Sequence, residues 1–122
     1  MRINLAATFQ NLIMTTSDVL RQYQIIATLS GKMLAQARAS QWDDVVELGE
    51  QYHEAVECLR TMDTLSDEDR AARRDLLARI LDDDAHIRIL ASPELSRLGA
   101  LLGNMKRQQS VLQAYGQTSP ST

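Results

Sequence analysis

Apolar residues recur at three- and four-residue steps through most of this chain, and that spacing limits its fold more than any other feature. The steps place these side chains on one face of a helix. Five Gly and two Pro in 122 residues leave long stretches without a helix breaker. Aromatic residues are only 4% of the chain, so aliphatic side chains must fill the interior, which favours helices over sheets. We therefore predict a single all-α domain.

Four amphipathic segments are predicted to form an antiparallel helical bundle. The first begins at Ser17 or Asp18, either of which is a suitable cap, and ends near Ala39. The second runs from about Trp42 to Met62, and the short link makes the two helices antiparallel neighbours. Their inward faces are predicted to be Val19, Leu20, Tyr23, Ile26, Ala27, Met33, Leu34 and Ala37, and then Val45, Leu48, Gly49, Tyr52, Val56, Leu59 and Met62.

The third segment follows a break at Thr64–Asp69, in which Ser66 and Asp69 resemble a capping box. Its apolar face is interrupted by Asp84, one of three consecutive aspartates. Asp82–Asp84 therefore predict that the helix bends, frays or turns toward solvent there. The apolar face of this segment consists of Ala72, Leu76, Leu77, Ile80, Leu81 and Ile87.

The fourth segment has the clearest start in the chain. Ser92 is a suitable cap, Pro93 suits the first helical position, and Glu94 favours the positive end of the helix. Gln109 is a polar gap in its broad apolar face. From Gly116 onward the composition is polar and predicts disorder. The apolar face consists of Leu95, Leu98, Leu101, Leu102, Met105, Leu112 and Tyr115.

These segments predict a four-helix domain at 17–116, between a leader at 1–16 and a disordered tail at 117–122. The leader is expected to be a short helix or an extended arm, and Met14 is an alternative start. Polar residues interrupt its apolar run and no small-residue cleavage site follows, so it does not resemble a secretory signal. No run of about 18 apolar residues predicts a membrane span. We expect a cytoplasmic protein without membrane insertion.

Charge disfavours direct binding to nucleic acid. The formal net charge is −3, and no aromatic residues lie among the basic ones to stack on bases. Intramolecular ion pairs or acidic protein partners are the preferred interpretation of the basic clusters. A nucleic-acid-binding regulator remains an alternative, and strongly salt-dependent binding would reveal it. The two basic clusters are Arg70, Arg73, Arg74 and Arg79, and then Lys106 and Arg107.

Residues suited to catalysis or metal binding do not converge in the sequence. His53 and His86 are expected to be partly exposed and to lack a partner at ligand spacing. Glu50 and His53 have the Glu-x-x-His spacing of di-iron bundles, but the second pair is missing. We predict no catalytic residues, metal or cofactor, with a metal-binding bundle as the weaker alternative. Cys58 is expected to be a small buried core residue.

The apolar faces of the third and fourth segments are broader than a minimal helical seam requires. Four helices could bury them against one another, and they could also form a groove for a partner's amphipathic helix or a homodimer contact. Gly99 and Gly103 would weaken the fourth helix and ease its displacement. Gly49 is either a close-approach position or a neutral one. The candidate partner-binding residues are Leu76, Leu77, Ile80, Leu98, Leu102, Met105 and Tyr115.

Two stretches resemble the FliT-type chaperones of flagellar export. The segment from Met105 to Gly116 resembles the C-terminal signature of that family, with an Ala-Tyr-Gly motif that contains Tyr115. Upstream, Leu29-Ser30, Met33-Leu34 and Gln41-Trp42-Asp43 resemble its first helical hairpin, in which a Trp-Asp pair opens the second helix. The similarity spans about Asp18 to Gly116, and the leader has no counterpart in the family pattern.

The resemblance implies a chaperone without catalytic activity. It would bind the C-terminal helical region of the filament-cap protein and deliver it to the type III export gate. In this family the fourth helix restrains partner binding, including contacts with the export ATPase complex, and the tyrosine at Tyr115 docks to the export-gate platform protein. Some members also restrain a flagellar master transcription activator. A helical regulator that binds such an activator is therefore the alternative function.

Overall fold

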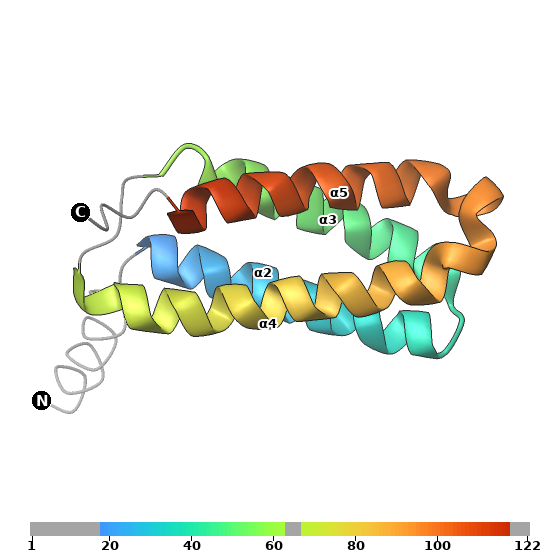
Figure 1. Cartoon of the computed structure of the whole chain (residues 1–122), viewed down its shortest axis with the longest axis horizontal. Coiled ribbons are helices and arrows are strands. Elements are labelled where there is room, and N and C mark those ends of the chain that lie inside the picture. The colour runs from blue at the N-terminus through green and yellow to red at the C-terminus, as the bar shows by residue number, and fades with distance from the viewer. Residues whose placement is uncertain (1–17, 63–66, 118–122) are drawn as a thin grey trace, which may run out of the picture.

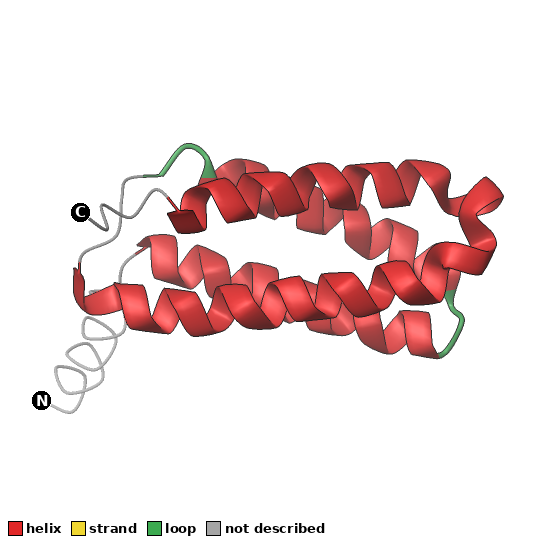
Figure 2. Ribbon diagram, in the orientation of Figure 1, coloured by secondary structure: helices red, strands yellow, loops and turns green. Residues whose placement is uncertain are grey.

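The described part of the chain is entirely helical. The computed structural model describes residues 18–62 and 67–117, and no strand occurs in either range (Figure 2). Its elements are α2 (Asp18–Arg38), α3 (Trp42–Leu59), α4 (Asp67–Ala91), the 3-10 turn η1 (Ser92–Glu94) and α5 (Leu95–Gln117). The predicted all-α class is confirmed. The predicted cap Ser66, the leader with Met14 and the end of the tail lie outside the described residues.

Successive helices run in opposite directions (Figure 1). α2 packs against α3 and α4, while α5 packs against the same two helices from the other side. The contacts that α5 makes are much sparser than those of α2. α4, η1 and α5 follow one another without a loop residue between them. The fold therefore has a densely packed part around α2 and a more loosely packed part beneath α5.

A tight connection joins α2 to α3. Ser40 adopts a positive φ of 59°, and its backbone N–H donates to the carbonyl of Ala37 at 3.0 Å. Gln41 N–H reaches back to Gln36 O at 2.9 Å, which satisfies another free carbonyl at the helix end. Such a left-handed residue after a helix reverses the chain within a few residues, and α3 begins at Trp42. The predicted antiparallel hairpin follows from this geometry.

The core forms where the helical spacing placed it. The predicted inward residues of α2 are all buried. Those of α3 are also buried, apart from half-buried Leu48, Gly49 and Met62. Gly49 is a close-approach position, because an added Cβ would lie 2.8 Å from Leu101 Cδ1 on α5. The approaching group is the side chain of Leu101.

The prediction that the aspartates would disturb α4 was wrong. The helix runs without interruption from Asp67 to Ala91, with Asp83 and Asp84 buried. Ser30 Oγ on α2 donates to Asp83 Oδ2 at 2.8 Å, and Arg88 Nε donates to Asp84 Oδ2 at 2.8 Å. Buried carboxylates are tolerated when such partners are present. Burial raises the pKa of Asp84, and the neighbouring Arg88 opposes that shift.

The fourth predicted helix starts later than expected. Ser92 makes no capping contact, because Ser92–Glu94 form the 3-10 turn η1 and Ala91 occupies its N-cap without a side-chain hydrogen bond. Pro93 lies at the start of that turn, and α5 begins at Leu95. Leu95 is 61% exposed rather than inward-facing, and the backbone is kinked at Leu98, with φ −109° and ψ 20°. A proline-containing 3-10 turn is therefore found where the sequence predicted a helix cap.

Three smaller expectations also need correction. Cys58 is exposed, so it is not the buried core residue predicted. Ala72 is exposed on α4 although its spacing placed it in the apolar face. α5 continues through Gly116 to Gln117, beyond the point where the polar tail was expected to begin. Within residues 18–62 and 67–117, no helix has the length and apolar content needed to cross a membrane.

Candidate partner-binding surface

The seven candidate partner-binding residues lie on the two adjacent helices α4 and α5. All seven pack into or against one hydrophobic cluster. Ile80, Leu98 and Met105 are fully buried within it, while the other four are half-buried at its edge. The edge residues are Leu76, Leu77, Leu102 and Tyr115. In this arrangement α4 packs mainly against α2 and more sparsely against α5, and the edge residues remain partly in contact with solvent.

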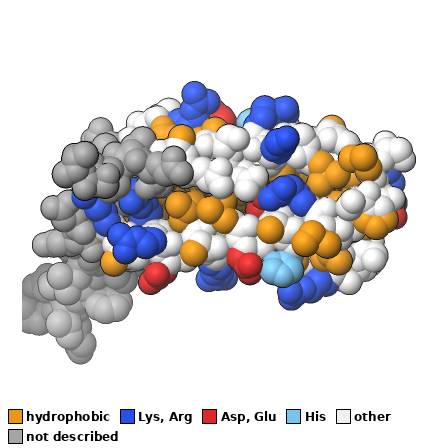
Figure 3. Space-filling view, viewed as in Figure 1, with side chains coloured by type: hydrophobic (Ala, Val, Ile, Leu, Met, Phe, Trp, Pro, Cys, Tyr) orange, Lys and Arg blue, Asp and Glu red, His pale blue; other side chains and the backbone are white. Residues whose placement is uncertain are grey.

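Apolar side chains reach the surface in two places on this face of the molecule. Figure 3 shows them along the seam between α4 and α5 and again at the end where α4 turns into α5. Near that turn, Ile89 is 70% exposed, and Leu90 and Leu95 are also exposed. Sequence analysis missed Ile89 and Leu90. The signal was present for Ile89, because it lies two residues from inward-facing Ile87 and a helix places such positions on nearly opposite sides.

Arg73 attaches the end of α5 to α4. The side chain is buried, and its Nη1 donates to the backbone carbonyl of Tyr115 at 3.3 Å. It also lies beside Tyr23 on α2: burial raises the pKa of the Tyr23 phenol, and the positive guanidinium opposes the shift. Arg73 thus makes an intramolecular contact, although to a carbonyl rather than to a carboxylate. Its Nε has no hydrogen-bond partner among the described residues.

The remaining basic residues lie near or at the surface. Arg74, Arg79 and Lys106 are exposed, and Arg70 is half-buried. Exposed Arg107 donates to the side chain of Asn104 one turn earlier. Both helices thus carry basic side chains on their outer surfaces, while the buried Arg73 is a structural contact.

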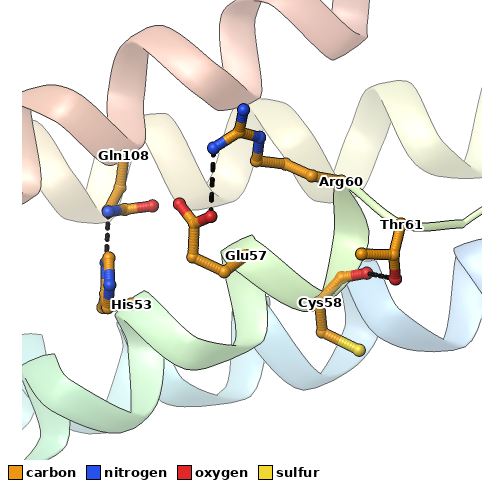
Figure 4. Close-up of polar contacts among 6 residues, drawn as sticks. All are labelled: His53, Glu57, Cys58, Arg60, Thr61 and Gln108. Atoms are coloured by element: carbon orange, nitrogen blue, oxygen red, sulfur yellow. Dashed lines mark hydrogen bonds and ion pairs between the residues drawn. The ribbon is translucent and has the colours of Figure 1, made fainter.

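Polar contacts also join α5 to α3. Gln108 reaches from α5 to α3, where its Nε2 is hydrogen-bonded to Nδ1 of His53 (Figure 4). At the start of α5, Arg97 forms exposed ion pairs with Asp43 at 3.8 Å and with Glu94 at 3.6 Å. Exposed pairs of this kind contribute little stability. The attachment of α5 to α3 thus depends mainly on Gln108 and on apolar packing.

The C-terminal end of α3 has a small group of local contacts. Arg60 pairs with Glu57 at 3.0 Å, and the Thr61 hydroxyl donates to the carbonyl of Cys58 at 2.8 Å (Figure 4). The Thr61 hydroxyl thus provides a hydrogen-bond donor for one carbonyl in the last turn of the helix. No group of three or more His, Cys, Asp and Glu side chains suited to a metal ion occurs within the two described ranges.

Comparisons with known proteins identify the family. A family model described as "Flagellar protein FliT" matches residues 20–117. The chain belongs to the FliT family. FliT of Yersinia enterocolitica is 38% identical over 103 residues, covering 81% of this chain and 85% of that protein. FliT of Serratia proteamaculans is 33% identical over 103 residues, covering 82% of this chain and 84% of that protein.

A solved FliT structure supports the same conclusion. The crystal structure of flagellar protein FliT from Bordetella bronchiseptica is 49% identical and superimposes with a TM-score of 0.57. The match covers 69% of this chain and 99% of that one. The resemblance drawn from the two sequence stretches is therefore confirmed. The FliT match begins two residues into α2 and extends to the end of α5.

Proposed function

We propose that this FliT-family protein is a cytoplasmic chaperone of flagellar export. It binds the C-terminal helical region of the filament-cap protein and delivers that client to the type III export gate. It acts by binding and carries out no reaction. Residues 17–116 form the chaperone domain, with 1–16 as a leader and 117–122 as a tail.

The observation that carries this proposal is that α5 packs against α4 and α3 less densely than α2 does, although the apolar residues of α4 and α5 belong to one cluster. A face covered by a loosely held helix suits an amphipathic client, because the client replaces one set of apolar contacts with another. Leu76, Leu77 and Ile80 on α4 form the client groove. Leu98, Leu102 and Met105 are the α5 residues that the client displaces.

Three features of α5 support its release. The backbone is already kinked at Leu98, close to the start of the helix. Gly99 and Gly103 lower helix propensity, each by about 1 kcal/mol relative to Ala. At the far end, Arg73 donates a hydrogen bond to the Tyr115 carbonyl, and the Tyr115 side chain is half-buried. Such an element should have a low free energy of local unfolding, and the parts of proteins that move usually have this property.

Tyr115 lies at that far end, where it is half-buried beside α4. Its ring is proposed to dock on the export-gate platform protein, and the same end of α5 restrains contact with the export ATPase complex. Displacing α5 for the client would therefore present Tyr115 at the same time. The two binding events are coupled through the position of one helix.

Calorimetry with a peptide from the C-terminal region of the cap protein tests the proposal. A chain that ends before Ser92 should bind the peptide more tightly than the full chain, because the cover is gone. In the full chain, Leu112→Ala should also strengthen binding by loosening α5, whereas Leu29→Ala on α2 is a matched control with no expected gain. Unchanged affinity after removal of η1 and α5 would reject this role of the helix for that client.

A further inference from the structure

A shallow groove follows the outer side of α2 and continues between α2 and α3. It consists of two hollows that share Lys32, with volumes of about 300 Å³ and 510 Å³. The second hollow extends from Lys32 to Asp44, Glu47 and Leu48 on α3. The first is lined by Arg21, Gln24, Ile25, Thr28, Leu29 and Lys32, all on α2. These two hollows together are called the α2 track.

The first hollow has the spacing and chemistry of a helix-packing face. Its residues recur at steps of three and four along α2, so they form one stripe. Ile25 is 43% exposed at its centre, beside buried Leu29. The Thr28 hydroxyl already donates to the carbonyl of Gln24 at 3.0 Å. An apolar centre with basic residues only at its two ends, Arg21 and Lys32, therefore suits a nearly uncharged amphipathic helix that lies along α2.

The leader directly before α2 has the sequence of such a helix. Asn4, Thr8 and Asn11 recur at steps of four and three, which places them on one helical face. The apolar residues form a separate face of the same helical pattern. That face consists of Leu5, Ala6, Phe9, Leu12 and Ile13. Because the FliT match begins at residue 20, this pattern is a feature of the chain outside the family match.

Length and connection also agree with the α2 track. As a helix with a rise of about 1.5 Å per residue, 3–14 would span about 18 Å, and Arg21 to Gln36 span about 22 Å on α2 by the same rise. Residues 15–17 then remain as the link to α2, which begins at Asp18. Antiparallel helices are commonly joined by about two to five residues. The leader can therefore reach the track of its own molecule.

Charge favours the same occupant and determines its direction. Arg2 is the only charged residue before Asp18. An antiparallel path places Arg2 at the far end of the track, where the exposed carboxylates of Asp44 and Glu47 lie on α3. A helix with several basic residues would be repelled by Lys32, and an acidic one by the two carboxylates.

We propose that residues 3–14 form an amphipathic helix that packs antiparallel to α2 on the α2 track of the same molecule. Phe9 then lies over Ile25, and Arg2 faces Asp44 and Glu47. The leader would thus be a fifth helix that closes the outer side of α2 and α3 to other proteins. The groove beside α5 stays accessible, and the proposal does not depend on the chaperone role.

Thiol labelling of the full-length chain tests the docking. In a Cys58→Ser background, the cysteine of Thr28→Cys lies in the middle of the track and should react slowly with a maleimide. Phe9→Asp should raise its rate about tenfold, because a charge replaces the ring that packs on Ile25. Asn11→Asp adds the same charge on the polar face and is the matched control. Equal rates with the natural leader and with Phe9→Asp would overturn the proposal.

Two further measurements exclude other causes of protection. The cysteine of Ala78→Cys, on the exposed side of α4, should react at the same rate with either leader, and a parallel increase there would assign Phe9 to overall stability instead. Protection at Thr28→Cys should be independent of protein concentration. Protection that appears only as the protein dimerises would assign the track to the leader of a second copy and reject docking within one molecule.

A charge exchange tests the direction of the helix. Arg2→Glu should speed labelling of Thr28→Cys by about twofold to fivefold, the value of an exposed ion pair. Adding Glu47→Arg should restore the slow rate, whereas adding Glu54→Arg, at an exposed position of α3 outside the track, should not. An unchanged rate in Arg2→Glu, or equal rates with the two added arginines, would rule out the antiparallel arrangement.

Discussion

α2 and α5 occupy opposite corners of the same fold but satisfy their polar groups differently. On the α2 side, Gln22 Nε2 donates to the carbonyl of Ala55 at 2.8 Å, and Ser30 donates to Asp83. On the α5 side, Oε1 of Gln108 lacks a partner among the described residues, as do the Tyr52 hydroxyl on α3 and Arg73 Nε and Asp84 Oδ1 on α4. Dense packing marks the part around α2 that holds the fold together. The α5 side is more loosely packed, as expected of a part that moves or binds a partner.

Matched methionines provide the largest test of this difference. Met33 on α2 is completely buried, and Met105 on α5 is 2% exposed. Met33→Ala should destabilise by about 2–5 kcal/mol, because the dense surroundings cannot collapse into the space. Met105→Ala should cost clearly less, since Met105 borders a small cavity between α3 and α5 and lies on a helix that can shift. Denaturant unfolding measures both, and equal losses would contradict the division into a rigid and a loose part.

Arg73 also lies beside Tyr23 on α2, but its loss should affect the end of α5 most strongly. Arg73→Met removes the donor to the Tyr115 carbonyl while keeping an unbranched apolar stem. Backbone amides near the end of α5 should then exchange with deuterium about tenfold faster, corresponding to the loss of about one hydrogen bond. Amides in α2 should be unaffected. Arg74→Met, at the exposed neighbouring position, is the control. Faster exchange throughout the chain would instead make Arg73 a support of the whole fold.

Asp84 gives the dense part a pH dependence of known sign. Burial raises its pKa in the folded state above the usual 3.8, with Arg88 opposing the shift. The protonated carboxyl is therefore favoured by folding, and its contribution to stability declines as pH rises from about 3.8 through the folded-state pKa. Relative to the natural chain, Asp84→Asn should gain stability between pH 4 and pH 7. Parallel curves of unfolding free energy against pH would contradict this assignment.

Tyr115 should show the smallest effect on stability. Arg73 binds its backbone carbonyl, so Tyr115→Ala keeps that hydrogen bond and removes the half-buried phenol side chain. We expect the thermal midpoint to change little and binding to the export-gate platform protein to weaken. Differential scanning fluorimetry and calorimetry measure the two properties separately. A large drop in the midpoint without a binding defect would assign the ring to packing.

The sequence predicted the dense part better than the loose one. Every residue predicted on the inward face of α2 is buried, because residues such as Ile26 and Met33 repeat at regular helical steps, although buried Gln22, Leu29 and Ser30 were missed. Asp83 was misjudged because its partner, Ser30, lies 53 residues away and leaves no local pattern. Ser92 was misjudged because a cap and a 3-10 turn share the same Ser-Pro signal.

The candidate site was only partly accessible to the same reasoning. Leu77 and Leu102 could be placed on apolar faces from their spacing alone. How far α5 covers them depends on the distance and angle between two helices. The spacing of apolar residues gives no information about that geometry. The small cavity between α3 and α5, beside Gly49, was likewise beyond reach, because it is lined by Tyr52 and Gln108 from helices far apart in the chain. The inward face of a helix can be predicted from its own residues, whereas a space between two helices depends on residues far apart in the chain.

The direct passage of α4 through η1 into α5 has a consequence for binding strength. With three residues of turn and no loop, α5 stays within reach of its own seat even when it is displaced. A tethered competitor acts at a high effective concentration, which no dilution of the protein can lower. If α5 occupies its seat 99% of the time, a client sees a groove about 100-fold weaker than the bare one. The three-residue turn thus sets how tightly a client must bind in order to displace α5.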